Sequence, residues 1–228
     1  MKRTVFRHEY KYLINVFQYE ILKSRLSFIN KDPYCQKDGF YSVRSLYMED
    51  LLGNSRFEKD SGTHKRNKIR LRTYNNSHDF ILLENKLKVG QLIQKKSRRI
   101  PKSLVKRILC DPLELNRVLR TEFPKMENRV ATKYYTPKAI IEYDREAYVI
   151  KNHNNLRINF DKSITTTLDI SLFFQNFTKF KKVTNSEQIV LEVKFTNYIP
   201  EHIKFLLNPL ESNLISFSKY AKSLSSLN

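Results

Sequence analysis

The sequence contains little glycine and cysteine. Its 228 residues include four glycines, and no two of them lie close together. A P-loop or a dinucleotide-binding turn needs clustered glycines, because backbone amides must approach the phosphates closely. The two cysteines, Cys35 and Cys110, are too few for a disulfide framework, and no Cys and His spacing is typical of a zinc site. If the chain binds phosphate, side chains must hold it.

Long apolar runs are also missing. The first twelve residues, MKRTVFRHEYKY, lack the apolar stretch of a signal peptide, and no uncharged run is long enough to span a membrane. We therefore expect a soluble, cytoplasmic protein. The length is sufficient to bury a core, and no segment resembles a linker, so we expect residues 1–228 to form a single domain.

Positive charge is in excess. Lys and Arg number 42 against 23 Asp and Glu, which gives a formal net charge of +19 at pH 7. A surplus of this size disfavours the compact state through self-repulsion and is typical of proteins that bind an anionic ligand. Nucleic acid, an acidic membrane surface and a polyphosphorylated small molecule are the candidate ligands.

Two-residue alternation of charged and apolar side chains is the strongest pattern, and it predicts strands with two unlike faces. In the segment KIRLR, the side chains of Lys68, Arg70 and Arg72 share one face, and the apolar side chains between them share the other. The same alternation recurs over residues 6–12, 80–88, 139–148, 156–161 and 190–195.

Turn and helix signals separate these strands. The pair Asn75-Asn76 and the segment 152–155 predict hairpins, and hairpins imply antiparallel pairing. Pro101 opens a predicted helix, which Pro112 interrupts. The predicted helices cover residues 15–29 (with Asn15 as cap), 101–122, 168–177, 200–208 and 213–226. We therefore expect an α+β fold, mostly antiparallel sheet with helices packed outside.

The charged strand faces have two explanations. The simpler one is that they lie in solvent while the apolar faces cover a core. However, the cations lie two residues apart on one face, where like charges repel unless an anion lies between them. Closing the sheet with these faces inward would create a basic channel. The aromatic residues Tyr10, Tyr12, Phe160 and Phe195 fall on the opposite faces, which disfavours nucleic acid, because bases stack on aromatics beside the basic groups.

An ordered series of motifs resembles the VTC-type polyphosphate polymerase domain, which belongs to the triphosphate tunnel metalloenzymes. The motifs are RHEYKY, SVRSLY, KIRLR, LLENKLK, IIEYDREAY, LRINFD, LEVKF and FSKY, and they run from about residue 3 to residue 222. The resemblance implies a closed antiparallel β-barrel tunnel that binds triphosphate together with a divalent metal, Mn²⁺ or Mg²⁺. It also implies ATP and polyphosphate as substrates.

The resemblance further implies roles for individual residues. Glu192 would bind the metal. The fifth strand would supply two further substrate-binding cations, and these are either Lys96 with Arg98, which we favour, or Lys95 with Arg99. The catalytic phosphate-binding residues would be Arg70, Arg72, Lys86, Arg145 and Arg157. Further substrate contacts would come from Lys11, Lys96, Arg98, Tyr143, Lys194 and Lys219. These types suit the chemistry, because Arg holds phosphate bidentately, Lys supplies a compact charge, and Mg²⁺ or Mn²⁺ prefers carboxylate oxygen.

The leading hypothesis is a metal-dependent transferase that adds the terminal phosphate of ATP to polyphosphate. A tunnel-type triphosphatase and a non-catalytic binder of polyphosphate or RNA are the alternatives. The triphosphatase branch opens with Glu-x-Glu-x-Lys, whereas Arg7 stands at the first acidic position here and leaves only Glu9 and Lys11. Glu9 and Glu84 could also simply pair with neighbouring lysines. A membrane-protein partner and the oligomeric state stay open.

Overall fold

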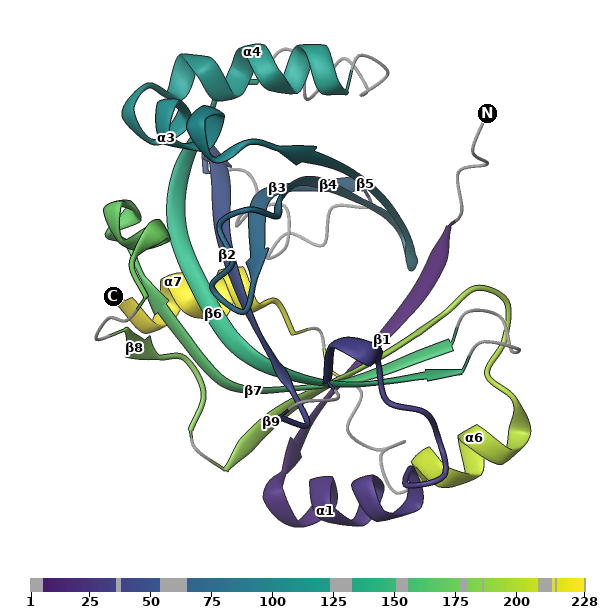
Figure 1. Cartoon of the computed structure of the whole chain (residues 1–228). Coiled ribbons are helices and arrows are strands. Elements are labelled where there is room, and N and C mark those ends of the chain that lie inside the picture. Colours follow the sequence, from purple (N-terminus) through teal and green to yellow (C-terminus); the bar gives the residue numbers. More distant parts are fainter. Residues whose placement is uncertain are drawn as a thin grey trace.

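The computed structural model describes residues 6–35, 38–53, 65–123, 133–150, 156–176, 180–185, 187–208, 215 and 217–227. More of these residues lie in antiparallel strands than in helices (Figure 1). Their bounds are β1 Arg7–Asn15, β2 Tyr41–Asp50, β3 Lys65–Tyr74, β4 Ile81–Val89, β5 Leu92–Ile100, β6 Tyr135–Ile150, β7 Leu156–Thr167, β8 Lys181–Lys182 and β9 Gln188–Phe195.

The sheet closes on itself. Its strand order is β6-β2-β3-β4-β5-β1-β9-β7-β8, and β6 also pairs with β7, so that eight strands form a barrel and β8 is added at the edge of β7. The predicted closed antiparallel barrel is therefore confirmed. The barrel closes least tightly between β1 and β5, where the registered pairs are Arg7 with Ile93 and His8 with Leu92.

Helices lie around the barrel (Figure 1). α3 and α4 follow β5, while α1 and α6 lie together at the opposite side. The helix bounds are α1 Val16–Arg25, η1 Pro33–Cys35, α3 Lys102–Cys110, α4 Pro112–Glu122, η2 Ile170–Phe174, α6 Glu201–Leu207 and α7 Lys219–Leu227, where η marks 3₁₀ turns. None of the helices in the described ranges is both long and apolar enough to cross a bilayer.

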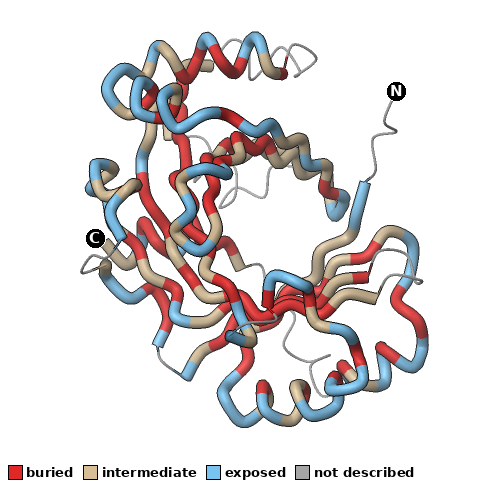
Figure 2. Tube along the Cα trace, viewed as in Figure 1, coloured by how far each residue is buried: buried red, intermediate tan, exposed pale blue. Residues whose placement is uncertain are grey.

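Three apolar clusters hold the barrel and helices together, and buried residues follow the strands (Figure 2). One cluster joins α1 and α6 to β1, β7 and β9, and it includes Tyr12, Phe160 and Phe195. These aromatic side chains pack under helices, as the alternation predicted. A second cluster joins α3 and α4 to β2, β3 and β4. The third joins α7 to β2 and β6, where Tyr220 stacks on Tyr47 with ring centroids 5.2 Å apart.

Local signals explain several element boundaries. Asn15 forms a capping box with Gln18 at the start of α1, and Pro112 begins α4. Asn75 and Asn76 both have positive φ, as a tight hairpin turn requires. The predicted helix at 168–177 is instead a shorter 3₁₀ turn, capped by Asp169. The predicted turn at 152–155 and the start of the predicted helix at 213–226 lie outside the described residues; α7 itself begins at Lys219.

Candidate functional site

A cavity of about 150 Å³ lies inside the barrel. Among the described residues, its lining includes ten Lys and Arg side chains and two carboxylates, those of Glu9 and Glu192. The alternation of the strands explains this wall, because every second residue of β1, β3, β4, β6 and β9 points inward. The charged rows thus converge on an enclosed space and do not spread over the outer surface.

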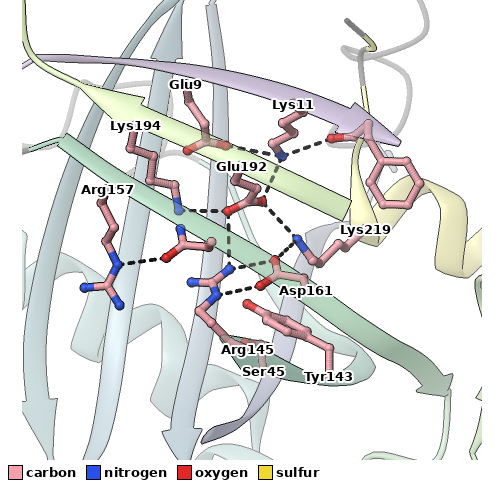
Figure 3. A network of polar contacts seen from close by, with 12 residues as sticks. Glu9, Lys11, Ser45, Tyr143, Arg145, Arg157, Asp161, Glu192, Lys194 and Lys219 are labelled. Atoms are coloured by element: carbon pink, nitrogen blue, oxygen red, sulfur yellow. Dashed lines mark hydrogen bonds and ion pairs between the residues drawn. The ribbon is translucent and has the colours of Figure 1, made fainter. Parts of the chain in front are cut away.

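Glu192 occupies the centre of an ionic network (Figure 3). Its Oε2 lies 2.8 Å from Lys194 Nζ, and its Oε1 lies 2.9 Å from Lys219 Nζ. Lys11 Nζ lies 3.5 Å from the same Oε1. Burial alone would raise the pKa of Glu192, but the nearby charges of Lys194, Lys219 and Lys11 outweigh burial and hold the pKa well below its usual value. The carboxylate is therefore ionised at neutral pH.

Glu9 forms a second carboxylate centre on β1. Both of its oxygens accept hydrogen bonds from Lys86 Nζ, at 2.9 and 2.8 Å, and Lys11 Nζ lies 3.2 Å away. Burial would raise the pKa of Glu9, whereas Lys86 and Lys11 lower it well below its usual value. The ion pairing expected as the simpler alternative for Glu9 is present.

Asp161 on β7 holds two of the cations in place. Arg145 donates from Nε and Nη2 to its two carboxylate oxygens at 2.6 and 2.7 Å, and Lys219 Nζ lies 2.5 Å from Oδ2. Burial would lower the pKa of Lys219, but Asp161 and Glu192 raise it above its usual value. α7 begins at Lys219, so the first turn of the last described helix brings this ammonium into the barrel.

Arg70 and Arg72 lie side by side on β3. Arg70 donates from Nε to Glu84 Oε2 at 2.7 Å, and Arg72 donates from Nε to Ser45 Oγ at 3.0 Å. Arg72 Nη2 also donates to the hydroxyl of Tyr143 at 3.1 Å. Glu84 is fully buried behind these guanidinium groups. The two forks are thereby fixed against the cavity, which suits bidentate recognition of phosphate oxygens.

Tyr47 and Lys68 are unusual titrating groups in the same wall. The Tyr47 hydroxyl accepts a hydrogen bond from Arg70 Nη1 at 2.9 Å. Burial would raise the pKa of Tyr47, but the positive charges of Arg70, Arg72 and Lys68 lower it to about 7. Burial lowers the pKa of Lys68 to about 7, and the charges of Lys11 and neighbouring cations act in the same direction. A polyanion in the cavity would relieve this mutual repulsion.

Arg157 is not brought to the cavity wall among the described residues. It lies opposite Lys194 on the expected face of β7, but its Nη2 contacts Asp32 Oδ2 at 2.6 Å and the Tyr41 hydroxyl at 2.7 Å. Asp32 lies in the segment between α1 and β2. The alternation of side chains in β7 does not predict that Arg157 pairs with it. A phosphate contact by Arg157 stays a prediction that requires this ion pair to open.

The choice of Lys96 and Arg98 on β5 is wrong. Lys95 pairs with Lys86 across the sheet, which puts Lys95 on the inner face and its neighbours on the outer face. Lys95 Nζ reaches Glu84 Oε1 at 2.8 Å, whereas Arg98 Nε lies 3.5 Å from Glu122 of α4, outside the barrel. The sequence QKKSRRI carries cations in both phases of a strand, so its own pattern leaves the phase undetermined.

The other predicted residues line the cavity: Lys11, Arg70, Arg72, Lys86, Tyr143, Arg145, Glu192, Lys194 and Lys219. Sequence reasoning assigned no role to Asp161, Tyr47 or Arg66. Asp161 could have been found, because it shares the inner face of LRINFD with Arg157. Arg66 extends the KIRLR row by two residues toward the chain start, so the same period also points to it. Tyr47 has no such signal.

The divalent metal implied by the resemblance fits these residues. Mg²⁺ and Mn²⁺ sites in phosphate enzymes commonly use one or two carboxylates together with substrate phosphates and water. Glu9 and Glu192 both lie within reach of Lys11 Nζ, at 3.2 and 3.5 Å, so their carboxylates face one point of the cavity. Within the described ranges no three His, Cys, Asp or Glu side chains are grouped to hold a metal alone. Glu9 and Glu192 would hold the metal together with substrate phosphates.

The closed barrel with its inward rows of cations is the architecture that the motif series predicted for this chain. The family model described as VTC domain matches residues 6–228, and the chain therefore belongs to the VTC domain family. This match confirms the family that the motif series indicated. No curated protein matches the sequence.

Solved structures share the fold at low sequence identity. A Hippeastrum protein named as an adenylyl cyclase, for which a dominant triphosphatase activity is recorded, has 13% identity and a TM-score of 0.54, with 97% of this chain and 95% of that chain covered. A protein from Bacillus halodurans named as an adenylate cyclase has 12% identity and a TM-score of 0.52, with 93% and 95% covered. At such identities the likeness concerns the fold alone.

Proposed function

We propose that the protein is a metal-dependent polyphosphate polymerase, which transfers the terminal phosphate of ATP to a growing polyphosphate chain inside the barrel. The observation that carries the proposal is the charge of the cavity, whose described lining has ten basic side chains and two carboxylates. A ligand with several closely spaced negative charges matches such a wall better than a singly charged metabolite. Membership of the VTC domain family supports the same substrate class.

Phosphoryl transfer requires mainly positioning and charge neutralisation from the protein. Arg70, Arg72 and Arg145 are held by hydrogen bonds to neighbouring side chains, so their guanidinium groups are positioned before substrate enters. Lys11 and Lys194 are held by carboxylates that a metal would otherwise engage. When bound, the metal supplies charge neutralisation at the phosphate oxygens.

The acceptor in this reaction is the terminal phosphate of polyphosphate, and it does not need a general base. A terminal phosphate of polyphosphate is already ionised near neutral pH, so it can attack the terminal phosphorus of ATP without a general base. ADP leaves, and the chain grows by one unit. Glu9 and Glu192 are both paired with lysines and ionised, and thus are better suited to hold charge than to carry protons.

The test is incubation of the purified protein with ATP and Mn²⁺, followed by gel analysis for a polyphosphate ladder and measurement of ADP. We expect both products, and an R70A/R72A variant that melts like the parent should make neither. Absence of polymer and of ADP with Mn²⁺, Mg²⁺ and other divalent metals would refute the proposal.

Hydrolysis of triphosphates is the second candidate. The recorded triphosphatase activity of the Hippeastrum protein favours it, and Tyr47, whose pKa of about 7 suits a group that accepts a proton from water, is a feature that a hydrolase could use. Against it, Arg7 at the first position of the Glu-x-Glu-x-Lys strand is exposed on β1. Release of orthophosphate without polymer would select this candidate.

We further propose that the protein works in the cytoplasm, where ATP is available as the donor. Binding of RNA is disfavoured, because Tyr12, Phe160 and Phe195 pack under helices and cannot stack on bases. A membrane-protein partner would have to bind the outer surface, since the cavity lies within the barrel.

A further inference from the structure

Three tyrosines form a cluster at the end of the barrel where β2 begins and β3 ends. Tyr34 lies in the 3₁₀ turn η1, Tyr41 is the first residue of β2 and Tyr74 is the last residue of β3. The ring centroids of Tyr34 and Tyr41 are 6.2 Å apart, and those of Tyr41 and Tyr74 are 5.8 Å apart. None of the three lines the cavity in the described part of the chain, so the cluster is separate from the wall of cations.

The ring of Tyr34 lies largely in solvent. Its exposed fraction is 74%, whereas Tyr41 behind it is buried. The rings of Tyr34 and Tyr41 meet at 66°, and those of Tyr41 and Tyr74 meet at 64°, so neither pair is stacked in parallel. A single exposed aromatic side chain is ordinary on a protein surface. Here the exposed ring is backed by two further rings, and the cluster therefore offers a surface on which a flat ligand can stack.

Hydrogen bonds hold the turn that carries Tyr34. The backbone N–H of Asp32 donates to the carbonyl of Ala147 on β6 at 2.8 Å, and the N–H of Cys35 donates to the carbonyl of Asp32 at 2.8 Å. The Asp32 carboxylate accepts a hydrogen bond from the backbone N–H of Tyr34 at 3.0 Å, and the side chain of Cys35 is fully buried. The Tyr34 ring is therefore positioned before a ligand binds, which lowers the entropic cost of binding.

The tyrosine cluster adjoins the guanidinium groups that would hold a triphosphate. Tyr74 follows Arg72 by two residues on the same face of β3, about 7 Å along the strand. Tyr41 is the cross-strand partner of Arg145. Burial raises the pKa of Tyr41 to about 12, although the nearby charge of Arg145 acts in the opposite direction. In a nucleotide the ribose separates the phosphates from the base, just as one strand step separates Arg72 from Tyr74.

We propose that Tyr34 and Tyr74 form a nucleobase-binding subsite, on which the base of a nucleoside triphosphate stacks while Arg72 and Arg145 hold its phosphates. The inference rests on the proposed function and adds the position of the base to it. Stacking requires a flat π-face and does not read a hydrogen-bond pattern, so adenine and the other bases should all bind. Inorganic tripolyphosphate has no base and should gain nothing from the subsite.

Calorimetric titration with ATP and with sodium tripolyphosphate, both without divalent metal, tests the subsite in the absence of turnover. Y34A should weaken ATP binding by about tenfold, because base–aromatic stacking is lost. It should leave tripolyphosphate binding within about twofold of the parent, because the replaced side chain carries no charge. F17A is the matched control: Phe17 of α1 is also 74% exposed, and its replacement should change neither affinity. Both variants should melt like the parent.

A fluorescent variant gives a readout that a structural role of Tyr34 would not change. The chain contains no tryptophan, so Y34W and F17W each carry a single indole. ATP should quench the emission of Y34W by stacking on the indole, whereas saturating tripolyphosphate should not, and F17W should respond to neither probe. Y34W should also keep the ATP affinity of the parent. Y34L fills a similar space but has no π-face, and it should bind ATP as weakly as Y34A does.

The outcomes separate this subsite from the proposed function. ATP binding by Y34A at the strength of the parent, or equal responses of Y34W to the two probes, would overturn the nucleobase subsite and leave the triphosphate site in place. Equal weakening of both probes in Y34A would mean that Tyr34 supports the fold of the site, and it would also overturn the subsite. Failure of the parent protein to bind either probe would overturn both proposals. Selective loss of ATP affinity in Y34A and Y34L is the result that the structure predicts.

Discussion

Arg72 is the residue whose replacement should separate catalysis from folding most clearly. It is buried, but the groups it contacts keep other partners: Glu84 stays paired with Arg70 and Lys95. We therefore expect R72A to fold and to lose about 10²-fold in ADP formation from ATP, as when one preorganised charge-stabilising donor is removed. R72K should recover only part of the rate, because Lys lacks the planar fork. Full activity of R72A would contradict the assignment.

Glu192 should matter for stability as well as for activity. Its carboxylate is buried among the charges of Lys11, Lys194, Lys219 and Arg145. E192Q leaves these cations without their shared partner, and a broken buried ion pair costs about 3–5 kcal/mol. Urea unfolding of the ligand-free variant should show this loss, and added tripolyphosphate should restore part of it. A variant as stable as the parent would mean that the network does not depend on Glu192.

The lowered pKa of Lys68 makes the stability of the protein depend on pH. The pKa of Lys68 falls from 10.5 to about 7 on folding, chiefly through burial. Between these values the unfolded chain binds the extra proton, so the free energy of unfolding rises with pH. The lowered pKa values of Lys194, about 8, and Tyr47, about 7, act in the same direction.

Chemical unfolding of the ligand-free protein at several pH values between 7 and 9 measures this effect. We expect stability to increase over the range, less steeply in K68M, which carries no titrating group at that position. K181M, on the exposed strand β8, is the control and should keep the full slope. A parent protein whose stability falls from pH 7 to pH 9 would show that these groups are not buried together.

At the scale of single elements, β5 carries cations on both of its faces, and the two faces should differ in their importance for activity. Its inner face carries Lys95, which contacts the buried Glu84, and its outer face carries Lys96 and Arg98. K96A/R98A should keep polymer synthesis within about twofold of the parent, because surface ion pairs contribute little. Should this double variant lose activity as R72A does, the register of β5 against β4 would have to be different in solution.

The strands of the wall could be predicted because alternation fixes which side chains share a face. KIRLR shows one charged and one apolar phase, so Arg70 and Arg72 were expected on the inner face and lie there. β5 could not be predicted in this way, because Lys95, Lys96 and Arg98 occupy both phases. Only its hydrogen bonds with β4 determine the phase, and these are long-range contacts that a single strand does not encode.

The helices followed from local signals where such signals exist. Asn15 with Gln18 and Pro112 mark helix starts through capping and fixed φ. The ion pair between Arg157 and Asp32 could not be expected, since it joins β7 to a distant segment between α1 and β2. The sequence therefore indicates the face on which Arg157 lies and gives no sign of the contact that holds it.

At the scale of the whole molecule, the net charge of +19 indicates an anionic ligand but not its place. Closure of the barrel concentrates positive charge at one place, because it brings cations from five strands and α7 together around one cavity in the described part of the chain. The sequence pattern alone left open whether the charged faces lie in solvent or inside. The family resemblance predicted the inside. The pairing of β6 with β7 closes the barrel, and the charged rows line its cavity.

The most direct test of the account is a crystal structure of the protein with a non-hydrolysable ATP analogue and Mn²⁺. We expect the triphosphate inside the barrel, with its oxygens contacting Arg70, Arg72 and Arg145 and the metal bound by Glu192. Phosphates bound on the outer surface, for instance at Lys96 and Arg98, with the cavity free of ligand, would contradict the central claim.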